Sequence, residues 1–367
     1  MNHIHAIQRE LEKKGWNGIL LTDEINQRYA CGFPFTDGFV LVGREKAWLI
    51  TDSRYIEAAT DAVKAETDEI EVLLFDNAHP KMRILKSLLP GLAAETGTEI
   101  KLAAEDGRLS HREFLSLEKL LGLELVSSEN TLEGLRASKD EDEIRSMTEA
   151  QRISERALEE TLQIIQPGMT EKEVAAELAY RMLRNGSEGN SFDPIVVTGR
   201  NTSTPHGVPG DTVLHPGDFL TMDFGSLKNG YCSDMTRTVA IGCATEEMRN
   251  LYATVLEAQL AGIAAAKAGI PGCEIDAAAR KIIQDAGYGA YFGHGFGHSL
   301  GLEIHEPPNA NPREKRLMPN GAVVSAEPGI YLPGQYGVRI EDVMILRPNG
   351  AEVITKAPKE SLLVIAE

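Results

Sequence analysis

The sequence predicts an α+β protein of two domains, a smaller α/β domain at residues 1–130 and a larger catalytic domain at residues 131–367. The length of 367 residues suits two domains that each bury a core of their own. Over the first part, helical and strand patterns alternate, as they do where helices pack on a mixed sheet. Near residue 130 the pattern changes to long amphipathic helices followed by a strand-rich region.

Periodicity and turn signals define the elements of the first domain. Apolar residues at Ile4, Ile7 and Leu11 form one face of a surface helix, and Asp52 or Ser53 is expected as the N-cap of a later one. The expected helices are 2–14, 52–65, 80–89 and one from Ser110, and the expected strands are 18–22, 39–42, 47–50, 70–75, 101–104 and 123–126. The charged residues of this domain, which contains no phosphate-binding loop, are expected to form a solvated face.

The second domain begins with helices and continues mainly with strands. Thr170 and Glu173 have the spacing of a capping box, which marks the start of a helix. The expected helices are 138–165, 170–185, 246–268 and 273–286, and the expected strands are 194–197, 219–225, 231–241, 296–304, 322–330 and 338–347.

Composition excludes several classes of function. With 37 basic and 55 acidic residues, the net charge of −18 argues against a nucleic-acid binder and against docking on an anionic membrane. The N-terminal segment lacks the pattern of a signal peptide, and no run of about 18 apolar residues is present. The four cysteines form no CxxC pair, which is typical of reduced thiols. We therefore expect a cytoplasmic protein with no membrane partner.

Three histidines occur in the glycine-rich stretch Gly293–Pro308, at His294, His298 and His305. Four glycines this close would each cost a helix about 1 kcal/mol, so an extended segment is expected. In a strand, His294 and His298 lie on the same face. The stretch taken alone leaves a second interpretation open, a glycine-rich turn with incidental histidines.

Two aspartates are predicted to converge on one face of a hairpin. Asn229-Gly230 is a strong signal for a two-residue turn, which makes Asp223 face Thr236. Asp234 then lies on the same face as Asp223, about 7–8 Å away along the diagonal. An exposed pair of acids is the alternative, but Asp223 lies among apolar residues, where an unpaired carboxylate is costly. A bound cation between the two carboxylates explains the pattern.

Charged residues interrupt two further apolar strands near the end of the chain. Glu327 ends one strand where Pro328 stops its ladder of hydrogen bonds. Arg339 and Glu341 share one face of the next strand. A surface ion pair accounts for those two residues alone, but not for the repetition of the pattern in the strands before them.

Together these residues resemble a known family. Asp223 and Asp234, Gly293–His298 with the downstream His305-Glu-Pro, Glu327-Pro-Gly and Arg339-Ile-Glu341-Asp are similar to the motifs of the pita-bread metallopeptidases, family M24, in the branch of Xaa-Pro aminopeptidases and Xaa-Pro dipeptidases (prolidases). The resemblance covers the whole chain. It implies a pita-bread catalytic domain preceded by a creatinase-type N-terminal domain, and the match is looser over the N-terminal domain.

The resemblance also implies a role for each matching residue. It implies five ligands of two divalent metal ions, two facing histidines that contact substrate or stabilise the intermediate, and three residues of the substrate pocket. The metal ligands are Asp223, Asp234, His298, Glu327 and Glu341, of which Asp234 and Glu341 bridge both ions; the facing histidines are His206 and His305; the pocket residues are His294, Tyr331 and Arg339. Ser299 stands where many relatives have glycine, and this change is not expected to disturb the ligands.

The implied activity is hydrolysis of the bond before proline in a peptide or dipeptide, by a metal-bridging hydroxide with Glu327 as general base, in a homodimer. Four carboxylates and one imidazole suit Mn²⁺ or Co²⁺, with Zn²⁺ or Fe²⁺ as alternatives. Other readings are a metal-independent creatinase-like amidinohydrolase, a non-catalytic binding protein of the same fold, and a methionine aminopeptidase. The full ligand set argues against the first two, and the N-terminal domain with the Arg339–Asp342 sequence argues against the third.

Overall fold

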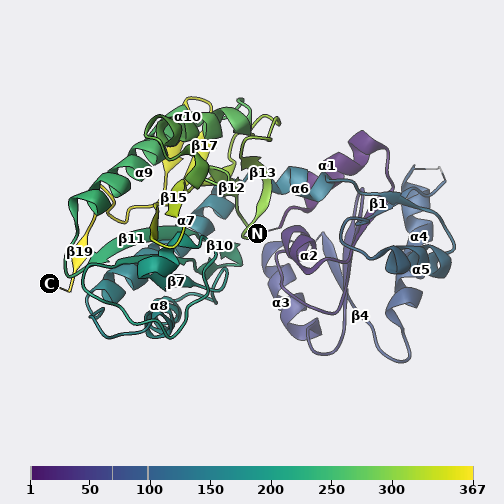
Figure 1. Ribbon diagram of the computed structural model, residues 1–367. Coiled ribbons are helices and arrows are strands. Elements are labelled where there is room, and N and C mark those ends of the chain that lie inside the picture. The colour runs from purple at the N-terminus through teal and green to yellow at the C-terminus, as the bar shows by residue number, and fades with distance from the viewer. Residues whose placement is uncertain (1, 68, 97–98, 367) are drawn as a thin grey trace. The chain divides into compact units, whose positions relative to one another are not determined.

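The computed structural model describes residues 2–67, 69–96 and 99–366 (Figure 1). The chain divides into two compact units, an N-terminal domain Met1–Leu135 and a C-terminal domain Arg136–Glu367. The sequence placed this boundary at residue 130. Among the described residues, no helix combines the length and the apolar character that crossing a membrane requires.

The N-terminal domain contains one mixed six-stranded sheet of order β4-β3-β2-β1-β5-β6. Strand β1 pairs antiparallel with β2 and parallel with β5, as expected for an α/β domain with a mixed sheet. Its strands are β1 (Gly18–Leu21), β2 (Gly38–Gly43), β3 (Ala47–Thr51), β4 (Ile70–Leu74), β5 (Leu102–Ala104) and β6 (Leu125–Ser127). Its helices are α1 (Ile4–Lys14), α2 (Glu24–Cys31), α3 (Ile56–Glu66), α4 (Lys81–Thr96) and α5 (His111–Leu121), and α6 (Thr131–Arg136) leads into the next domain.

Three helices of this domain differ from the prediction. Helix α2 was not predicted; the side chain of Asp23 caps it by accepting from Asn26 N–H. Helix α3 begins after Tyr55 without a side-chain cap, so the prediction of Asp52 or Ser53 as its N-cap was wrong. Asp52 accepts instead from the backbone N–H of Arg54, within the preceding turn. Helix α4 continues through Pro90, beyond the end predicted for it.

The C-terminal domain is built on two sheets, of order β19-β11-β8-β7 and β13-β12-β14-β17-β18, and two short strand pairs. The strands of the first sheet are β7 (Ile195–Thr198), β8 (Phe219–Phe224), β11 (Met235–Ile241) and β19 (Val364–Ile365). Those of the second are β12 (Gly297–Ser299), β13 (Glu306–Ala310), β14 (Val323–Ala326), β17 (Asp342–Arg347) and β18 (Gly350–Val353). The short pairs are β9 (Leu227–Lys228) with β10 (Tyr231–Cys232), and β15 (Gly329–Leu332) with β16 (Tyr336–Arg339).

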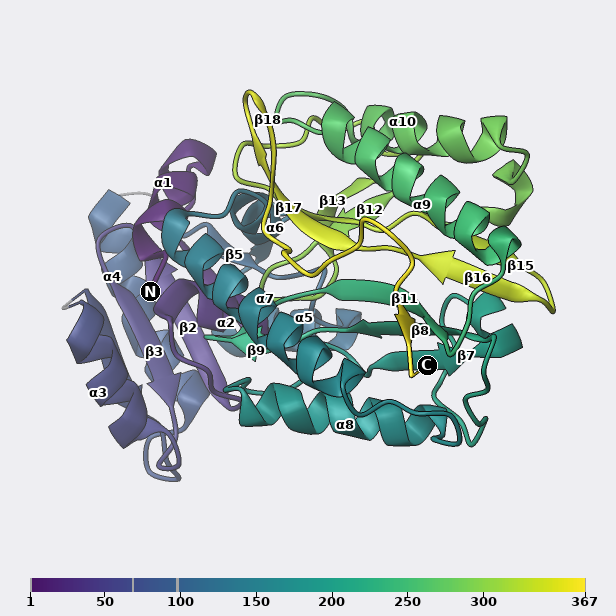
Figure 2. The same ribbon diagram turned by 90° about the vertical axis from the view of Figure 1, so that its left-hand side faces the viewer.

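Each sheet of this domain is covered by a pair of helices. The helices are α7 (Glu141–Leu162), α8 (Glu171–Arg184), α9 (Glu246–Ala265) and α10 (Gly272–Asp285), with 3₁₀ turns η1 (Gly199–Ser203) and η2 (Gly289–Tyr291). Helices α7 and α8 share an apolar core with β7, β8 and β11. Helices α9 and α10 share another with strands of the second sheet, and the two helix pairs lie on opposite sides of the strands (Figure 2). This is the α+β architecture that the sequence predicts.

The hairpin register follows the prediction. Lys228 pairs with Tyr231, and Asp223 pairs with Thr236. The hairpin arms approach closely at Gly225, where an added Cβ would lie 1.9 Å from the carbonyl oxygen of Ser233. Position 225 therefore requires glycine, because the other arm of the hairpin leaves no room for a Cβ atom.

Strands that were predicted as continuous are broken beside the charged residues. The predicted strand 322–330 is divided into β14 and β15 at Glu327-Pro328, and 338–347 into β16 and β17 at Ile340-Glu341. The predicted strand 231–241 is interrupted at Ser233-Asp234. In place of 296–304 only Gly297–Ser299 is a strand, so His294 lies outside it and the prediction of a shared strand face with His298 was wrong. At such breaks the side chains do not follow the alternating directions of a strand, so several of them can point into one cavity.

Candidate metal centre

One cavity of about 570 Å³ in the C-terminal domain collects the residues selected from the sequence. Its walls include carboxylates and histidines from both sheets and from the breaks between strands. All ten selected residues line it: His206, Asp223, Asp234, His294, His298, His305, Glu327, Tyr331, Arg339 and Glu341. The pairing of two sheets thus brings together side chains that are more than a hundred positions apart in the sequence.

Asp234, His298 and Glu341 form the centre of this group. One ligand atom from each lies within 4.8 Å of the others. His298 Nε2 lies 3.5 Å from Asp234 Oδ2 and 3.4 Å from Glu327 Oε1. His298 Nδ1 lies 3.2 Å from the carbonyl oxygen of Ser299, which can only accept, so Nδ1 carries the proton. The lone pair of Nε2 therefore points toward the carboxylates, as a metal ligand requires.

The carboxylates of the cavity are buried close together. Burial, and next the charge of Asp223, raises the pKa of Asp234 well above its usual range. Burial, and next the charge of Asp234, does the same to the pKa of Glu341. The pKa of Glu327 is raised too, again chiefly by burial. Carboxylates held in this way repel one another unless positive charge lies among them.

Asp223 gives a direct test of whether a cation fits. Its Oδ2 accepts from Arg339 Nη2 at 2.6 Å, while its Oδ1 is buried and has no hydrogen-bond partner among the described residues. A buried carboxylate oxygen without a partner is costly, and a bound cation satisfies it. The donor set of four carboxylates and one imidazole also suits divalent first-row metals. The residues of the cavity therefore fit divalent metal ions.

Thr236 and Ser325 hold the segments and side chains of Glu341, Glu327 and His298 in place, and neither was selected from the sequence. Thr236 Oγ1 donates to Glu341 Oε2 at 2.7 Å and accepts from Arg339 Nε at 3.0 Å. Ser325 Oγ donates to Glu327 Oε1 at 3.2 Å and accepts from the backbone N–H of His298 at 3.0 Å. Thr236 could have been identified from the sequence by its predicted cross-strand pairing with Asp223. The signal for Ser325 was its position two residues before Glu327 in an otherwise apolar strand.

Arg339 lines the cavity and is hydrogen-bonded to several of its other lining residues. Besides Asp223 and Thr236, it donates through Nη1 to Tyr331 Oη at 2.9 Å and to the Pro205 carbonyl at 3.3 Å. Tyr331 Oη lies 2.9 Å from His294 Nε2. The carboxylate that Arg339 contacts in the structure is thus that of Asp223. These bonds use four of its five N–H groups and leave one, on Nη2, without an acceptor among the described residues.

His206 and His305 are exposed at the cavity. The ring centroid of His305 lies 4.4 Å from that of His298, and His206 lines the cavity beside Pro205. Partial burial, and next the charge of His298, lowers the pKa of His305, so its imidazole is neutral at neutral pH and carries one N–H donor.

A buried ion cluster holds the turn that carries His305. Glu306, the next residue, accepts from Lys139 Nζ at 3.1 Å and from Arg136. Burial alone would raise the pKa of Glu306, but the charges of Lys139 and Arg136 bring it below its usual value. Ser299, the departure from the family pattern, turns its hydroxyl away from the ligands and donates to the Pro308 carbonyl at 2.5 Å.

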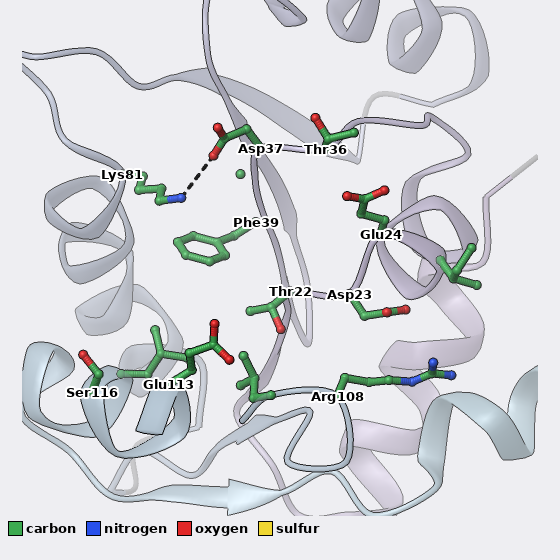
Figure 3. A pocket seen from close by; sticks show the side chains of 14 residues that line it. Thr22, Asp23, Glu24, Thr36, Asp37, Phe39, Lys81, Arg108, Glu113 and Ser116 are labelled. Carbon is green, nitrogen blue, oxygen red and sulfur yellow. Dashed lines mark hydrogen bonds and ion pairs between the residues drawn. The ribbon is translucent and has the colours of Figure 1, made fainter. Parts of the chain in front are cut away.

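The N-terminal domain has a larger cavity, of about 670 Å³, with a different character (Figure 3). Its charged side chains serve the local fold. Asp37 pairs with Lys81 at 3.2 Å, Asp23 caps α2, and Glu113 completes the capping box of α5 with Ser110. These acids are already engaged, and the arrangement agrees with the solvated face expected for this domain.

The fold and the donor set together define a metal-binding enzyme of the α+β class. The model of metallopeptidase family M24 matches residues 145–348, and the creatinase/prolidase N-terminal domain matches residues 3–138. The chain belongs to metallopeptidase family M24, and the resemblance noted from its motifs is confirmed.

Relatives match over nearly the full length. The Xaa-Pro dipeptidase of Pyrococcus furiosus is 34% identical over 361 residues, covering 98% of this chain and 99% of the relative. The solved structure of an Xaa-Pro dipeptidase from Bacillus anthracis is 39% identical with a TM-score of 0.90, covering 99% of each chain. That of an X-Pro aminopeptidase from Thermotoga maritima is 37% identical with a TM-score of 0.89, covering 97% of this chain and 100% of the other.

Proposed function

We propose that this metallopeptidase holds two divalent ions and hydrolyses the peptide bond before proline. The observation that carries the proposal is the cavity itself, where Asp223, Asp234, His298, Glu327 and Glu341 converge from separate segments. Relatives from three organisms, similar over almost the whole chain, bear names that state Xaa-Pro cleavage. These five residues would hold the ions, with Asp234 and Glu341 at the centre of the group.

The roles of the chain's own residues follow from their surroundings. When bound, divalent ions supply a nucleophile at neutral pH by lowering the pKa of water, and they polarise the scissile carbonyl. Glu327 accepts the proton of the attacking water and returns it to the departing amine. Burial raises the pKa of Glu327 above its usual value, which favours its taking up a proton.

The histidines act on the substrate. His305 and His206 donate N–H groups to the oxygen on which charge develops, because an imidazole ring carries at least one N–H donor. His294, Tyr331 and Arg339 form the wall behind the substrate. Their hydrogen bonds to one another keep that wall fixed while Arg339 also holds Asp223.

The activity is tested with protein stripped of metal and then reloaded with Mn²⁺ or Co²⁺. We expect hydrolysis of an Xaa-Pro dipeptide or an Xaa-Pro-Yaa tripeptide to disappear on stripping and return on reloading, with no cleavage of the matching Xaa-Ala peptides. Comparison of the two proline peptides then assigns a dipeptidase or an aminopeptidase. Unchanged cleavage by metal-free protein would contradict the proposal. Hydrolysis of creatine, or release of methionine from a Met-Ala-Ser peptide without cleavage before proline, would replace it with one of the other readings.

A further inference from the structure

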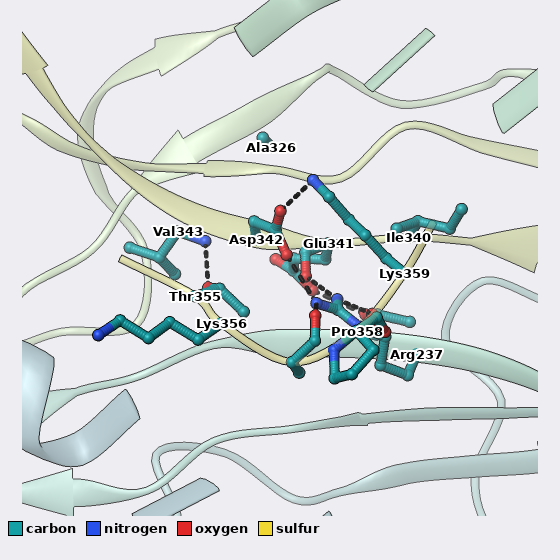
Figure 4. A network of polar contacts seen from close by, with 12 residues as sticks. Arg237, Ala326, Ile340, Glu341, Asp342, Val343, Thr355, Lys356, Pro358 and Lys359 are labelled. Atoms are coloured by element: carbon teal, nitrogen blue, oxygen red, sulfur yellow. Dashed lines mark hydrogen bonds and ion pairs between the residues drawn. The ribbon is translucent and has the colours of Figure 1, made fainter. Parts of the chain in front are cut away.

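A buried polar network joins the segments that carry Glu327 and Glu341. We call it the rear network, and it consists of Arg237 on β11, Gln259 on α9, Asp342 on β17 and Lys359 in the C-terminal segment. Figure 4 shows Arg237, Asp342 and Lys359. Arg237 follows the ligand Asp234 by three positions, and Asp342 directly follows the ligand Glu341. None of the four side chains lines the cavity.

Arg237 attaches the main chain at Glu341 to the C-terminal segment. The side chain of Arg237 is 3% exposed, and all five of its N–H groups are used. Their acceptors are the carbonyl oxygens of Thr236 (2.9 Å), Glu341 (2.6 Å), Ala357 (2.6 Å) and Pro358 (3.1 Å) and the carboxylate Oδ1 of Asp342 (2.9 Å). The backbone N–H of Glu341 in turn donates to Thr236 O at 3.1 Å. The peptide units around this ligand are therefore held from both sides.

Gln259 joins the segments of two different ligands. Its Nε2 donates to the carbonyl oxygen of Ala326 at 3.1 Å and to that of Ile340 at 3.3 Å. These are the residues immediately before Glu327 and Glu341. A single amide group, fully buried, thus links the last residue of β14 to the break between β16 and β17, next to the two glutamates. Both of its N–H donors are used, so the link fixes the spacing of the two segments.

Lys359 determines which way this amide faces. Its Nζ donates to Gln259 Oε1 and to Asp342 Oδ2, so the amide nitrogen of Gln259 must point toward the two carbonyls. The side chain of Asp342 is 1% exposed and receives both Lys359 and Arg237, which balance its charge in the interior. The C-terminal segment therefore supplies the amine that orients the link between Glu327 and Glu341.

We propose that Gln259 and Lys359 are positioning residues, which set the separation of Glu327 and Glu341 and thereby the affinity of the centre for divalent ions. This inference rests on the proposed metal function and deepens it, because it makes residues 357–359 of the C-terminal segment part of the metal centre. Partners that orient metal ligands from outside typically contribute 10–100-fold in metal affinity. Neither residue touches the substrate cavity, so the effect runs through the two glutamates.

The test measures Co²⁺ binding to the full-length protein by calorimetry and by its visible spectrum. The variants are Gln259→Glu, which keeps an acceptor for Lys359 but loses both donors, and Lys359→Met, which removes the amine. The matched control is Lys356→Met, since Lys356 is exposed in the same segment. We expect about 10–100-fold weaker Co²⁺ binding and an altered cobalt spectrum in both variants, with the control unchanged.

Unaltered Co²⁺ affinity and spectrum in folded Gln259→Glu would overturn the inference. If Lys359→Met does not fold, the result for Gln259→Glu alone is decisive. Failure of the proposed function looks different, because wild-type protein would then neither bind Co²⁺ tightly nor cleave before proline. Wild-type protein that does both, beside variants that bind equally well, would refute the positioning role alone.

Discussion

Glu327→Gln is expected to lower kcat for an Xaa-Pro substrate by about 10²–10⁴-fold, the usual contribution of a positioned acid or base. The amide of Gln has nearly the shape of the carboxyl group but does not accept a proton. Its carbonyl oxygen can still receive the hydrogen bond from Ser325, so the local fold is expected to remain. Stopped-assay kinetics on metal-loaded protein measure kcat and KM separately.

The matched control for this substitution is Glu352→Gln, which removes a carboxylate that is 62% exposed on β18. We expect kcat of the control to equal that of the wild type. If kcat of Glu327→Gln also stays within about threefold of the wild type, Glu327 is not the general base.

His298→Ala and His305→Ala are expected to fail in different ways. His298 directs Nε2 at the carboxylates, so its loss should weaken metal binding strongly. We expect more than the roughly 100-fold loss of affinity that follows removal of a residue that only orients a ligand. His305 lies beside His298 but is assigned to the substrate oxygen, so its loss should leave metal binding intact. The expected cost there is about 10²–10³-fold in kcat.

Metal content after equilibrium dialysis, measured beside kcat, separates the two histidines. The exposed His215, which does not line the cavity, serves as the control in His215→Ala. Equal loss of metal in His298→Ala and His305→Ala would mean that their assignment is mistaken.

Local signals in the sequence predicted the hairpin and the start of helix α8. The Asn229-Gly230 turn fixes the pairing of Asp223 with Thr236, because a two-residue turn leaves one register. The capping box at Thr170 marks the start of α8 for a similar reason, since both of its hydrogen bonds lie within four residues.

Features that depend on tertiary structure were missed. One predicted strand is broken at Ile340-Glu341, and the strand at His298 is shorter than predicted. Both differences occur where two sheets meet, and the periodicity within one segment contains no information about such a meeting. Helix α2 was missed because its eight residues carry little apolar periodicity over so short a span.

Chemistry singled out the acids and three of the histidines, the family resemblance added His206 and Tyr331, and the supporting residues were not predicted. Buried acids in apolar strands stand out in a sequence because they are rare there. Thr236, Ser325 and Gln259 do not stand out, since neutral polar residues are common and their partners are distant in sequence. Their contribution becomes visible only once the ligand segments lie side by side.

The number of divalent ions bound per chain tests the central claim most directly. Metal-free protein is titrated with Mn²⁺ or Co²⁺ while bound metal and cleavage of an Xaa-Pro peptide are followed in the same sample. The five ligands and the orphaned oxygen of Asp223 predict two ions per chain, with cleavage absent before metal is added and complete when both ions are bound. Saturation at one ion per chain, or cleavage before proline without any metal, would contradict this account.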